Sequence, residues 1–304
     1  MCPMSFRAGE IAVIGRPNAG KSTLVNRIVG EKVAIVSDKP QTTRKRILGV
    51  ARRPGVELAL VDTPGIHRPE HRMNTAMVRD AVGALESADL VLFVVDAAQH
   101  PGRGEDFVVR LLGRARTPAI LALNKIDLLS KAKLLPLMAA FAEKHAFLEI
   151  VPVSAKTGDG VERLVELVAA HVPEADAAYP EDFLTATSET EWVAEVIREK
   201  LLERTREELP FASTVVVEGV REDEEKALSV VTASIVVERE GQKAIVVGKG
   251  GAMIREIGTA AREELEATSG RRYFLDITVR VRPDWRDDER FLSRIVGDPA
   301  THKS

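Results

Sequence analysis

The stretch Gly15-Arg16-Pro17-Asn18-Ala19-Gly20-Lys21-Ser22 fits the phosphate-binding pattern G-x(4)-G-K-[ST] and decides the fold. It follows the apolar run Ile11–Ile14 and precedes a helical pattern with apolar residues from Leu24 to Val29. The glycines let successive backbone N–H groups turn toward phosphate oxygens, and the start of a helix favours negative charge there. Although a glycine-rich turn without a ligand is the alternative, the pattern predicts that Lys21 contacts the β and γ phosphates and that the Ser22 hydroxyl ligates Mg²⁺.

Length and composition indicate a protein of two domains. The chain has 304 residues, of which 45% are hydrophobic, and no apolar run is long enough to span a membrane. No secretory signal is recognisable, so we expect a cytoplasmic protein. The single cysteine, Cys2, excludes a disulfide framework and a cysteine metal site. His67 and His71 fall in a predicted loop, which favours a solvated pair over a metal site.

The first half alternates short apolar runs with longer amphipathic ones. This pattern predicts an α/β domain with a mostly parallel sheet and helices on both faces, whose ligands bind beyond the carboxyl ends of the strands. Arg46–Val50 is expected to be an antiparallel edge strand. The other predicted strands are Ile11–Ile14, Val56–Val61, Leu90–Val95, Ala119–Leu123 and Ile150–Val153.

A proline-containing segment without periodicity separates the two halves. We expect a first domain over residues 1–172, a linker over 173–187 and a second domain over 188–304. Ser188 and Glu191 have capping-box spacing and predict a helix that Pro210 ends. Strands are expected at Thr214–Val220, Leu228–Val237 and Tyr273–Val281, with a helix beginning near Ala252, and the residues after Val296 are expected to be disordered.

Three further motifs follow predicted strands and select the nucleotide. Asp62-Thr63-Pro64-Gly65 places a carboxylate for Mg²⁺ and a glycine N–H for the γ-phosphate. Asn124-Lys125-Ile126-Asp127 supplies two carboxylate oxygens that can accept the adjacent N1–H and amine donors of guanine, which adenine lacks. Ser154-Ala155-Lys156 offers the Ala155 N–H to the guanine carbonyl. Each motif alone could cap a turn, but their order at successive strand ends predicts a guanine-nucleotide site.

A loop that could close over the γ-phosphate lies between the first helix and the edge strand. It contains Gln41-Thr42-Thr43-Arg44, and on positional analogy we favour Thr43 over Thr42 as a further Mg²⁺ ligand. Ordering of this loop by GTP would make the domain a switch. Ile66 stands where Ras-like enzymes have a glutamine that orients water, so intrinsic hydrolysis should be slow. A potassium ion, an altered loop or a partner must supply the missing function.

The second half contains the glycine-rich loop Gly248-Lys249-Gly250-Gly251. Its order of helix, two strands, loop, helix and strand resembles a type II KH domain, in which a G-x-x-G loop clamps the backbone of single-stranded nucleic acid. A dinucleotide-binding fingerprint is disfavoured because Met253 stands where a third glycine is needed. From residue 241 to residue 282, eight positive residues stand against five negative ones, although the whole chain carries a formal charge of −3.

Taken together, these motifs resemble those of the Era family of bacterial GTPases. The resemblance extends from Glu10 to about Ile295 and includes Val237–Lys243 and Trp285–Arg290. It implies an α/β P-loop GTPase domain followed by an α+β type II KH domain. It also implies GTP hydrolysis with Mg²⁺, binding of the 3′ end of small-subunit ribosomal RNA, assembly of the small ribosomal subunit and partial association with the inner face of the cell membrane. We expect a monomer.

The expected site residues fall into four groups. Lys21, Thr43 and Gly65 are expected to act in hydrolysis, and Ser22, Thr43 and Asp62 to hold Mg²⁺. Gly248, Lys249, Gly250 and Gly251 are expected to bind RNA. The nucleotide is expected to contact Asn18, Gly20, Lys21, Ser22, Thr23, Asp62, Asn124, Lys125, Asp127, Ser154, Ala155 and Lys156.

Two other functions stay open at this point. The chain could be a GTP-sensing RNA chaperone in which hydrolysis is incidental, because Ile66 cannot orient water. The second domain could instead bind protein or a membrane surface, because the whole chain is slightly acidic.

Overall fold

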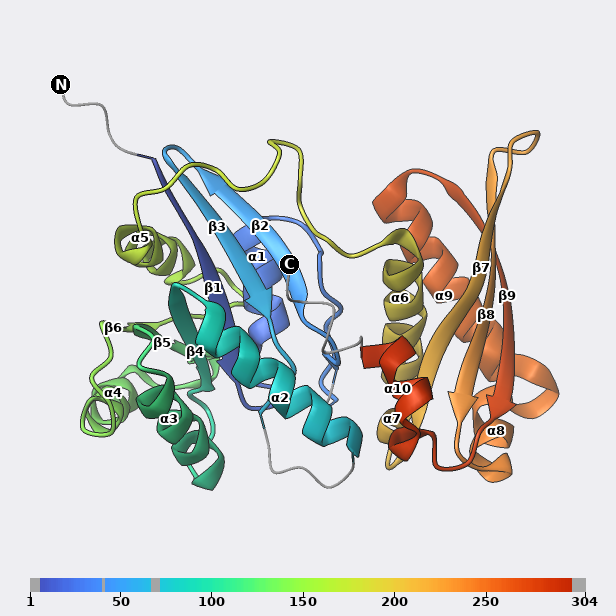
Figure 1. Cartoon of the computed structure of the whole chain (residues 1–304). Helices are drawn as coiled ribbons and strands as arrows, with labels where there is room; N and C mark the ends of the chain where they lie inside the picture. The colour runs from blue at the N-terminus through green and yellow to red at the C-terminus, as the bar shows by residue number, and fades with distance from the viewer. Residues whose placement is uncertain (1–5, 40–41, 67–71, 297–304) are drawn as a thin grey trace. The chain divides into compact units, whose positions relative to one another are not determined.

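The computed structural model describes residues 6–39, 42–66 and 72–296. The predictions about Cys2, Gln41, His67, His71 and the segment after Val296 concern residues outside these ranges. The chain divides into two compact units (Figure 1). Of the described residues, 6–36 and 43–186 form the first unit, and 37–39, 42 and 187–296 form the second. Each unit is built around its own sheet.

The sheet of the first unit has the predicted, mostly parallel arrangement. Its strand order is β2-β3-β1-β4-β5-β6, and only β2 runs antiparallel to its neighbour, which confirms the predicted edge strand. The strands are β1 (Arg7–Gly15), β2 (Ile47–Arg53), β3 (Val56–Asp62), β4 (Leu90–Asp96), β5 (Ala119–Asn124) and β6 (Glu149–Pro152).

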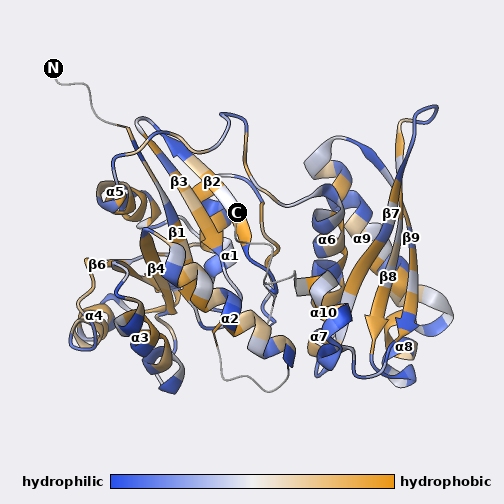
Figure 2. Cartoon of the chain, viewed as in Figure 1, coloured by the Kyte–Doolittle hydropathy of each residue, from blue (hydrophilic) through white to orange (hydrophobic). Residues whose placement is uncertain are grey.

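Helices cover both faces of this sheet because its strands are apolar on both sides. Ile11 and Val13 of β1 pack with α1 (Lys21–Val29) and α5 (Val161–His171). Ala12 and Ile14 pack instead with the other helices. Figure 2 shows hydrophobic residues, in orange, along strands of this sheet. Those helices are α2 (Arg72–Ser87), α3 (Arg103–Ala115) and α4 (Leu134–Ala142), and 3₁₀ turns lie at Ile126–Leu128 and Lys131–Lys133. The alternation buries both faces.

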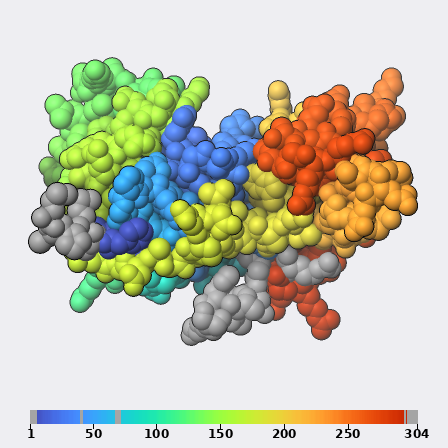
Figure 3. Space-filling model, turned by 90° about the horizontal axis from the view of Figure 1, so that it is seen from above, coloured from blue at the N-terminus to red at the C-terminus, as the bar shows by residue number. Residues whose placement is uncertain are grey.

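The segment that precedes the second unit is hydrogen-bonded to the first. Arg52 on β2 donates from Nη1 to the carbonyl of Phe183 at 2.8 Å, and the buried Glu57 accepts the backbone N–H of Ala178 at 2.7 Å. Figure 3 shows this stretch in yellow-green at the surface of the first unit. It has the irregular backbone that its sequence indicates, yet side chains of β2 and β3 fix its course.

The second unit packs helices on one face of a three-stranded sheet. The order is β7-β8-β9, with an antiparallel first pair and a parallel second pair. Its core joins Val196 of α6, Ile235 of β8 and Ile257 of α9. The elements are α6 (Glu189–Arg204), α7 (Leu209–Ala212), β7 (Ser213–Asp223), β8 (Leu228–Val237), α8 (Glu240–Val247), α9 (Ala252–Ser269), β9 (Arg272–Val281) and α10 (Glu289–Val296), with 3₁₀ turns at Lys249–Gly251 and Trp285–Asp287.

The predicted start of α6 is confirmed, but its predicted end is wrong. The Ser188 hydroxyl accepts the backbone N–H of Glu191 at 3.3 Å, and the Glu191 carboxylate accepts the N–H of Ser188 at 3.1 Å. The helix ends at Arg204, before Pro210 is reached. Pro210 instead lies in the first turn of α7, where its missing N–H has no helical partner to lose.

No helix among residues 6–39, 42–66 and 72–296 combines the length and apolarity needed to cross a membrane.

Candidate nucleotide-binding and RNA-binding sites

Lys21 lies at the centre of the predicted phosphate-binding loop. It begins α1, which is joined to β1 by residues 16–20, and its Nζ donates to the carbonyls of Arg16 at 3.1 Å and Gly15 at 3.4 Å. Burial lowers the pKa of Lys21, while the nearby Asp62 carboxylate acts in the opposite direction. An anionic ligand would therefore relieve the cost of burying this ammonium group.

The three predicted metal ligands come together from separate parts of the sequence. Ser22 Oγ donates to Asp62 Oδ2 at 2.6 Å and lies 3.0 Å from Thr43 Oγ1. Thr43 Oγ1 lies 3.2 Å from the same Asp62 oxygen. Ser22 is in the first turn of α1, Asp62 ends β3, and Thr43 precedes β2. Two hydroxyls and a carboxylate thus converge on one point.

The hydroxyl groups of the two neighbouring threonines make different contacts. The hydroxyl of Thr42 donates to the carbonyl of Lys39 at 2.6 Å and so closes a local turn. The hydroxyl of Thr43 is the one beside Ser22 and Asp62. The geometry thus supports the choice of Thr43.

The converging group fits Mg²⁺ by its chemistry. Asp62 is fully buried, and its second oxygen, Oδ1, makes no hydrogen bond within the described residues. Burial raises the pKa of Asp62, opposed by Lys21 and by hydrogen bonds from Ser22 and Thr43. An unsatisfied buried oxygen among hydroxyl oxygens suits a hard divalent cation. Across the described ranges, no group of three His, Cys, Asp or Glu side chains offers an alternative metal site.

Asn124 ties the predicted base site to the phosphate-binding loop. Its Nδ2 donates to the carbonyl of Ala19 at 2.8 Å, and its Oδ1 accepts the N–H of Ala155 at 2.9 Å. A Cβ on Gly20 would lie 2.2 Å from Asn124 Nδ2, so only glycine permits this approach. Because the Ala155 N–H already has an acceptor, its predicted bond to the guanine carbonyl requires that this donor be shared.

The predicted guanine-binding residues lie on two neighbouring loops. Ser154 Oγ donates to Asp127 Oδ1 at 2.7 Å, which orients the carboxylate in the 3₁₀ turn after β5. Arg27 of α1 donates to the carbonyls of Ala155 at 3.2 Å and Lys156 at 2.6 Å, which fixes the loop after β6. The arrangement presents a carboxylate beside a braced backbone, as recognition of guanine requires.

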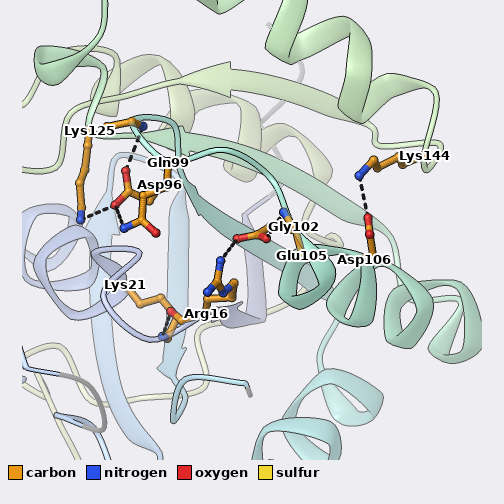
Figure 4. A network of polar contacts seen from close by, with 10 residues as sticks. Arg16, Lys21, Asp96, Gln99, Gly102, Glu105, Asp106, Lys125 and Lys144 are labelled. Carbon is orange, nitrogen blue, oxygen red and sulfur yellow. Dashed lines mark hydrogen bonds and ion pairs between the residues drawn. The ribbon is translucent and has the colours of Figure 1, made fainter. Parts of the chain in front are cut away.

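Asp96 is a site residue that the sequence motifs did not identify. Its Oδ2 accepts from Lys125 Nζ at 2.7 Å and from Gln99 Nε2 at 2.9 Å, and Figure 4 shows the three side chains together. Lys125 has a left-handed backbone, with φ 66°. The available signal was an acidic residue at the carboxyl end of β4, the edge at which the other motifs gather.

Ile66 is packed into the core. Its side chain is fully buried and packs with the cluster formed by α2, α3 and the neighbouring strands. Its backbone N–H donates to the carbonyl of Gly15 at 3.0 Å. An isoleucine side chain in this apolar cluster offers no polar group that could orient water.

The predicted RNA loop lies between two helices. Gly248, Gly250 and Gly251 have φ values of 72°, 58° and 77°, which favour glycine, and Lys249 is exposed between them. The loop leads directly into α9, whose first N–H groups favour an anion. The preceding helix, α8, was not predicted, and its Ile245 is 53% exposed beside the loop. The surface combines the Lys249 cation, a helix start and apolar area.

Family comparisons match both units. The model described as "50S ribosome-binding GTPase" matches residues 10–125, and the model described as "KH domain" matches residues 210–286. The second match agrees with the predicted KH fold.

Full-length relatives extend this match along the chain. A protein named GTPase Era from Geobacter metallireducens is 48% identical over 290 residues, covering 95% of this chain and 97% of its own length. GTPase Era from Heliobacterium modesticaldum is 44% identical and covers 92% of this chain and 94% of its own length.

Two solved structures have the same overall fold. One, described as Era in complex with MgGDPNP and nucleotides 1506–1542 of 16S ribosomal RNA, has a TM-score of 0.92 and 37% identity. The other, a single-residue variant of Aquifex aeolicus Era bound to GDP and AlF4⁻, has a TM-score of 0.92 and 36% identity. Each comparison covers 96% of this chain and 99% of the solved one. The chain therefore belongs to the Era family of GTPases.

Proposed function

We propose that this chain is a GTP-hydrolysing switch that binds the 3′ region of small-subunit ribosomal RNA through its KH domain and acts in assembly of the small ribosomal subunit. Binding and hydrolysis of GTP are supported by the convergence of Ser22, Thr43 and Asp62 beside Lys21. The RNA half is supported by the KH match and by the ribosomal RNA in the complex of the related Era.

The chemistry assigns distinct roles to these residues. Lys21 neutralises phosphate charge, and Ser22, Thr43 and Asp62 would hold Mg²⁺, which supplies further positive charge at the phosphates. Asp127 reads the guanine donors, while Asn124 and Lys125 brace the loops around it. The backbone of Gly65 meets the γ-phosphate. The nucleotide contacts proposed in addition are those of Asn18, Gly20, Thr23, Ser154, Ala155 and Lys156.

Water activation has to come from outside residue 66. The buried Ile66 offers no polar group, so the proposal includes a slow intrinsic rate that a potassium ion, a change in the loop around Thr43 or the RNA partner raises. Loop ordering around Thr43 would then report which nucleotide is bound.

The proposed domain limits are those that the sequence indicates. We assign residues 1–172 to the GTPase domain and 188–304 to the KH domain, joined by the linker 173–187. Arg52 donates a hydrogen bond to the linker and Glu57 accepts one from it, which makes the linker a docked segment of the first unit. We also propose a monomeric cytoplasmic protein, with peripheral association at the inner face of the cell membrane as the remaining expectation from the family.

RNA-stimulated turnover separates a switch from an RNA chaperone in which hydrolysis is incidental. We expect GTP hydrolysis to rise at least about tenfold when single-stranded RNA containing the recognised 3′ region is added, because a partner can complete an incomplete catalytic site. The measurement is phosphate release at saturating GTP, with and without RNA. Equal rates in the two conditions, with RNA bound in both, would favour the chaperone.

Substitution of the glycine-rich loop tests the RNA site. Replacing Lys249 and Gly250 by Asp should weaken RNA binding by roughly 10- to 150-fold, because a phosphate contact is lost and like charge is added. Nucleotide affinity should not change. Filter binding across a salt series should also show a slope of about −0.7 per neutralised phosphate in the unaltered protein.

The β7–β8 turn provides a matched control for this variant. Lys226 and Ala227 are exposed, and Ala227 has φ 47°, close to the 58° of Gly250. Replacing both by Asp makes a comparable charge change at another left-handed turn of the same unit. If the loop variant, still folded by circular dichroism, kept its RNA affinity and salt slope, the loop would be a structural turn and a protein or membrane partner would take precedence.

A further inference from the structure

The phosphate-binding loop is contacted from outside by the first turn of α3. Arg16, the second residue of the loop motif, donates from Nη1 to Oε1 of Glu105 at 2.9 Å. Figure 4 shows the two side chains reaching toward each other from the loop and from α3. The Glu105 side chain is only 7% exposed, compared with 40% for Arg16. A charge-assisted bond to a buried carboxylate is stronger than a solvated surface pair.

Glu105 is fixed at its other oxygen. Oε2 accepts the backbone N–H of Gly102 at 2.7 Å, and Gly102 is the residue that caps α3. A glutamate at the third helical position commonly reaches back in this way. One carboxylate therefore joins the start of α3 to the phosphate-binding loop, and its own hydrogen bond limits the freedom of its partner Arg16.

A glycine in α3 makes room for this contact. A Cβ at Gly104 would lie 2.6 Å from both Cδ and Nε of Arg16. Glycine in a helix costs stability relative to alanine, so intrinsic helix preference does not favour it at this position. Gly113, in the same helix, would meet nothing within 4 Å. The close approach of Arg16 therefore gives Gly104 a physical reason that Gly113 lacks.

The backbone of the same loop segment touches the predicted phosphate contacts. The Arg16 carbonyl accepts from Lys21 Nζ at 3.1 Å and from the Ala19 N–H at 3.4 Å. On the opposite side, a Cβ at Gly65 would lie 2.6 Å from the backbone nitrogen of Pro17. Any displacement of Arg16 therefore moves the atoms that hold Lys21 and that pack against Gly65.

We propose that Arg16 and Glu105 form a clamp that positions the phosphate-binding loop, so that both are positioning residues for nucleotide binding. The inference rests on the proposed function, because it places the phosphates in this loop. The clamp acts on loop N–H groups facing phosphates that GDP and GTP share. Loss of the clamp therefore weakens the binding of GDP and of GTP to a similar extent. The same loss raises KM for GTP more than it lowers kcat at saturation.

Conservative substitutions separate the clamp from the helix cap. Glu105→Gln keeps a residue that can cap α3 but removes the charge that holds Arg16. Glu105→Gln and Arg16→Gln should each accelerate release of fluorescent GDP and of a non-hydrolysable GTP analogue by roughly tenfold. The double variant should be no worse than either single variant, because both changes remove one interaction.

Two matched controls lie in the same helix. Asp106 is the residue after Glu105, and its carboxylate pairs with Lys144 at 2.6 Å in an exposed position. Asp106→Asn removes this charge. It should leave both release rates unchanged. Gly104→Ala should accelerate release without lowering the unfolding temperature, whereas Gly113→Ala should leave release unchanged.

The outcomes distinguish the alternatives. Wild-type release rates in Glu105→Gln would overturn the clamp. A defect in Arg16→Gln that Glu105→Gln does not share would also overturn it, because Arg16 would then contact phosphate directly. Equal loss in Asp106→Asn and Gly113→Ala, with lower unfolding temperatures, would make the contact merely structural. Failure of the unaltered protein to bind guanine nucleotides would instead refute the proposed function.

Discussion

Asp127→Asn should convert the protein from guanine to xanthine nucleotides. Asp127 offers two carboxylate oxygens to the two adjacent donors of guanine. One of these oxygens, Oδ1, also accepts a hydrogen bond from Ser154 Oγ at 2.7 Å. An asparagine presents one acceptor and one donor, which matches the N1–H and the C2 carbonyl of xanthine. A site built on such a match rejects the wrong base by roughly 10⁴-fold or more, so the preference for GTP over XTP should fall by a factor of that order.

Competition between nucleotides measures this change. Fluorescent GDP bound to the unaltered protein should be displaced by GTP but not by ATP or XTP, and in Asp127→Asn by XTP in preference to GTP. Asp159→Asn is the matched control, because it removes the same charge at an exposed position in the loop after β6. An unchanged preference for GTP over ATP and XTP in Asp127→Asn would remove Asp127 from the base site.

The convergence of the candidate nucleotide-site residues was largely predictable because these residues lie at strand ends. Lys21 and Ser22 follow β1, Asp62 ends β3 and Asn124 ends β5. In a parallel sheet these carboxyl ends share one edge, so the sequence order of the motifs already brings their side chains near each other. The strand assignments required only apolar runs between polar motifs.

What the sequence did not indicate depends on contacts between distant residues. The ion pair of Arg16 with Glu105 joins positions 89 residues apart, and Glu105 has no motif of its own. The bond from Arg52 to Phe183 spans 131 residues. The shared donor at Ala155 likewise depends on where Asn124 points. Tertiary contacts of this kind leave no periodic pattern in the chain.

Short helices were missed for a different reason. α7 has four residues and α8 has eight, too few for a helical pattern to repeat. Pro210 predicts a helix end because proline disrupts helix interiors, although it is equally suited to a first turn. Both α7 and α8 form in the context of the second core, which supplies the stability that their own length does not.

Lys21→Ala should abolish tight triphosphate binding while RNA binding by the second unit persists. Lys21 is the buried cation of the phosphate-binding loop, next to Asp62. Truncating one partner of a buried charge pair costs about 2–5 kcal/mol, which is roughly 30- to 4,000-fold in affinity. The second unit has its own core, which includes Ile235 and Ile257, and its RNA loop contains none of the altered atoms.

Titration with fluorescent GTP and filter binding of RNA, on the same preparation, test both halves of this prediction. The exposed Lys131, in the 3₁₀ turn before α4, provides a control, since Lys131→Ala removes a positive charge away from the phosphate-binding loop. Wild-type GTP affinity in Lys21→Ala would refute the phosphate site. Loss of RNA binding together with GTP binding, in a variant that unfolds at the normal temperature, would show that RNA binding depends on the nucleotide. The two units would then be functionally coupled although each has its own core. The RNA affinity of the KH domain would depend on the state of the loop around Lys21.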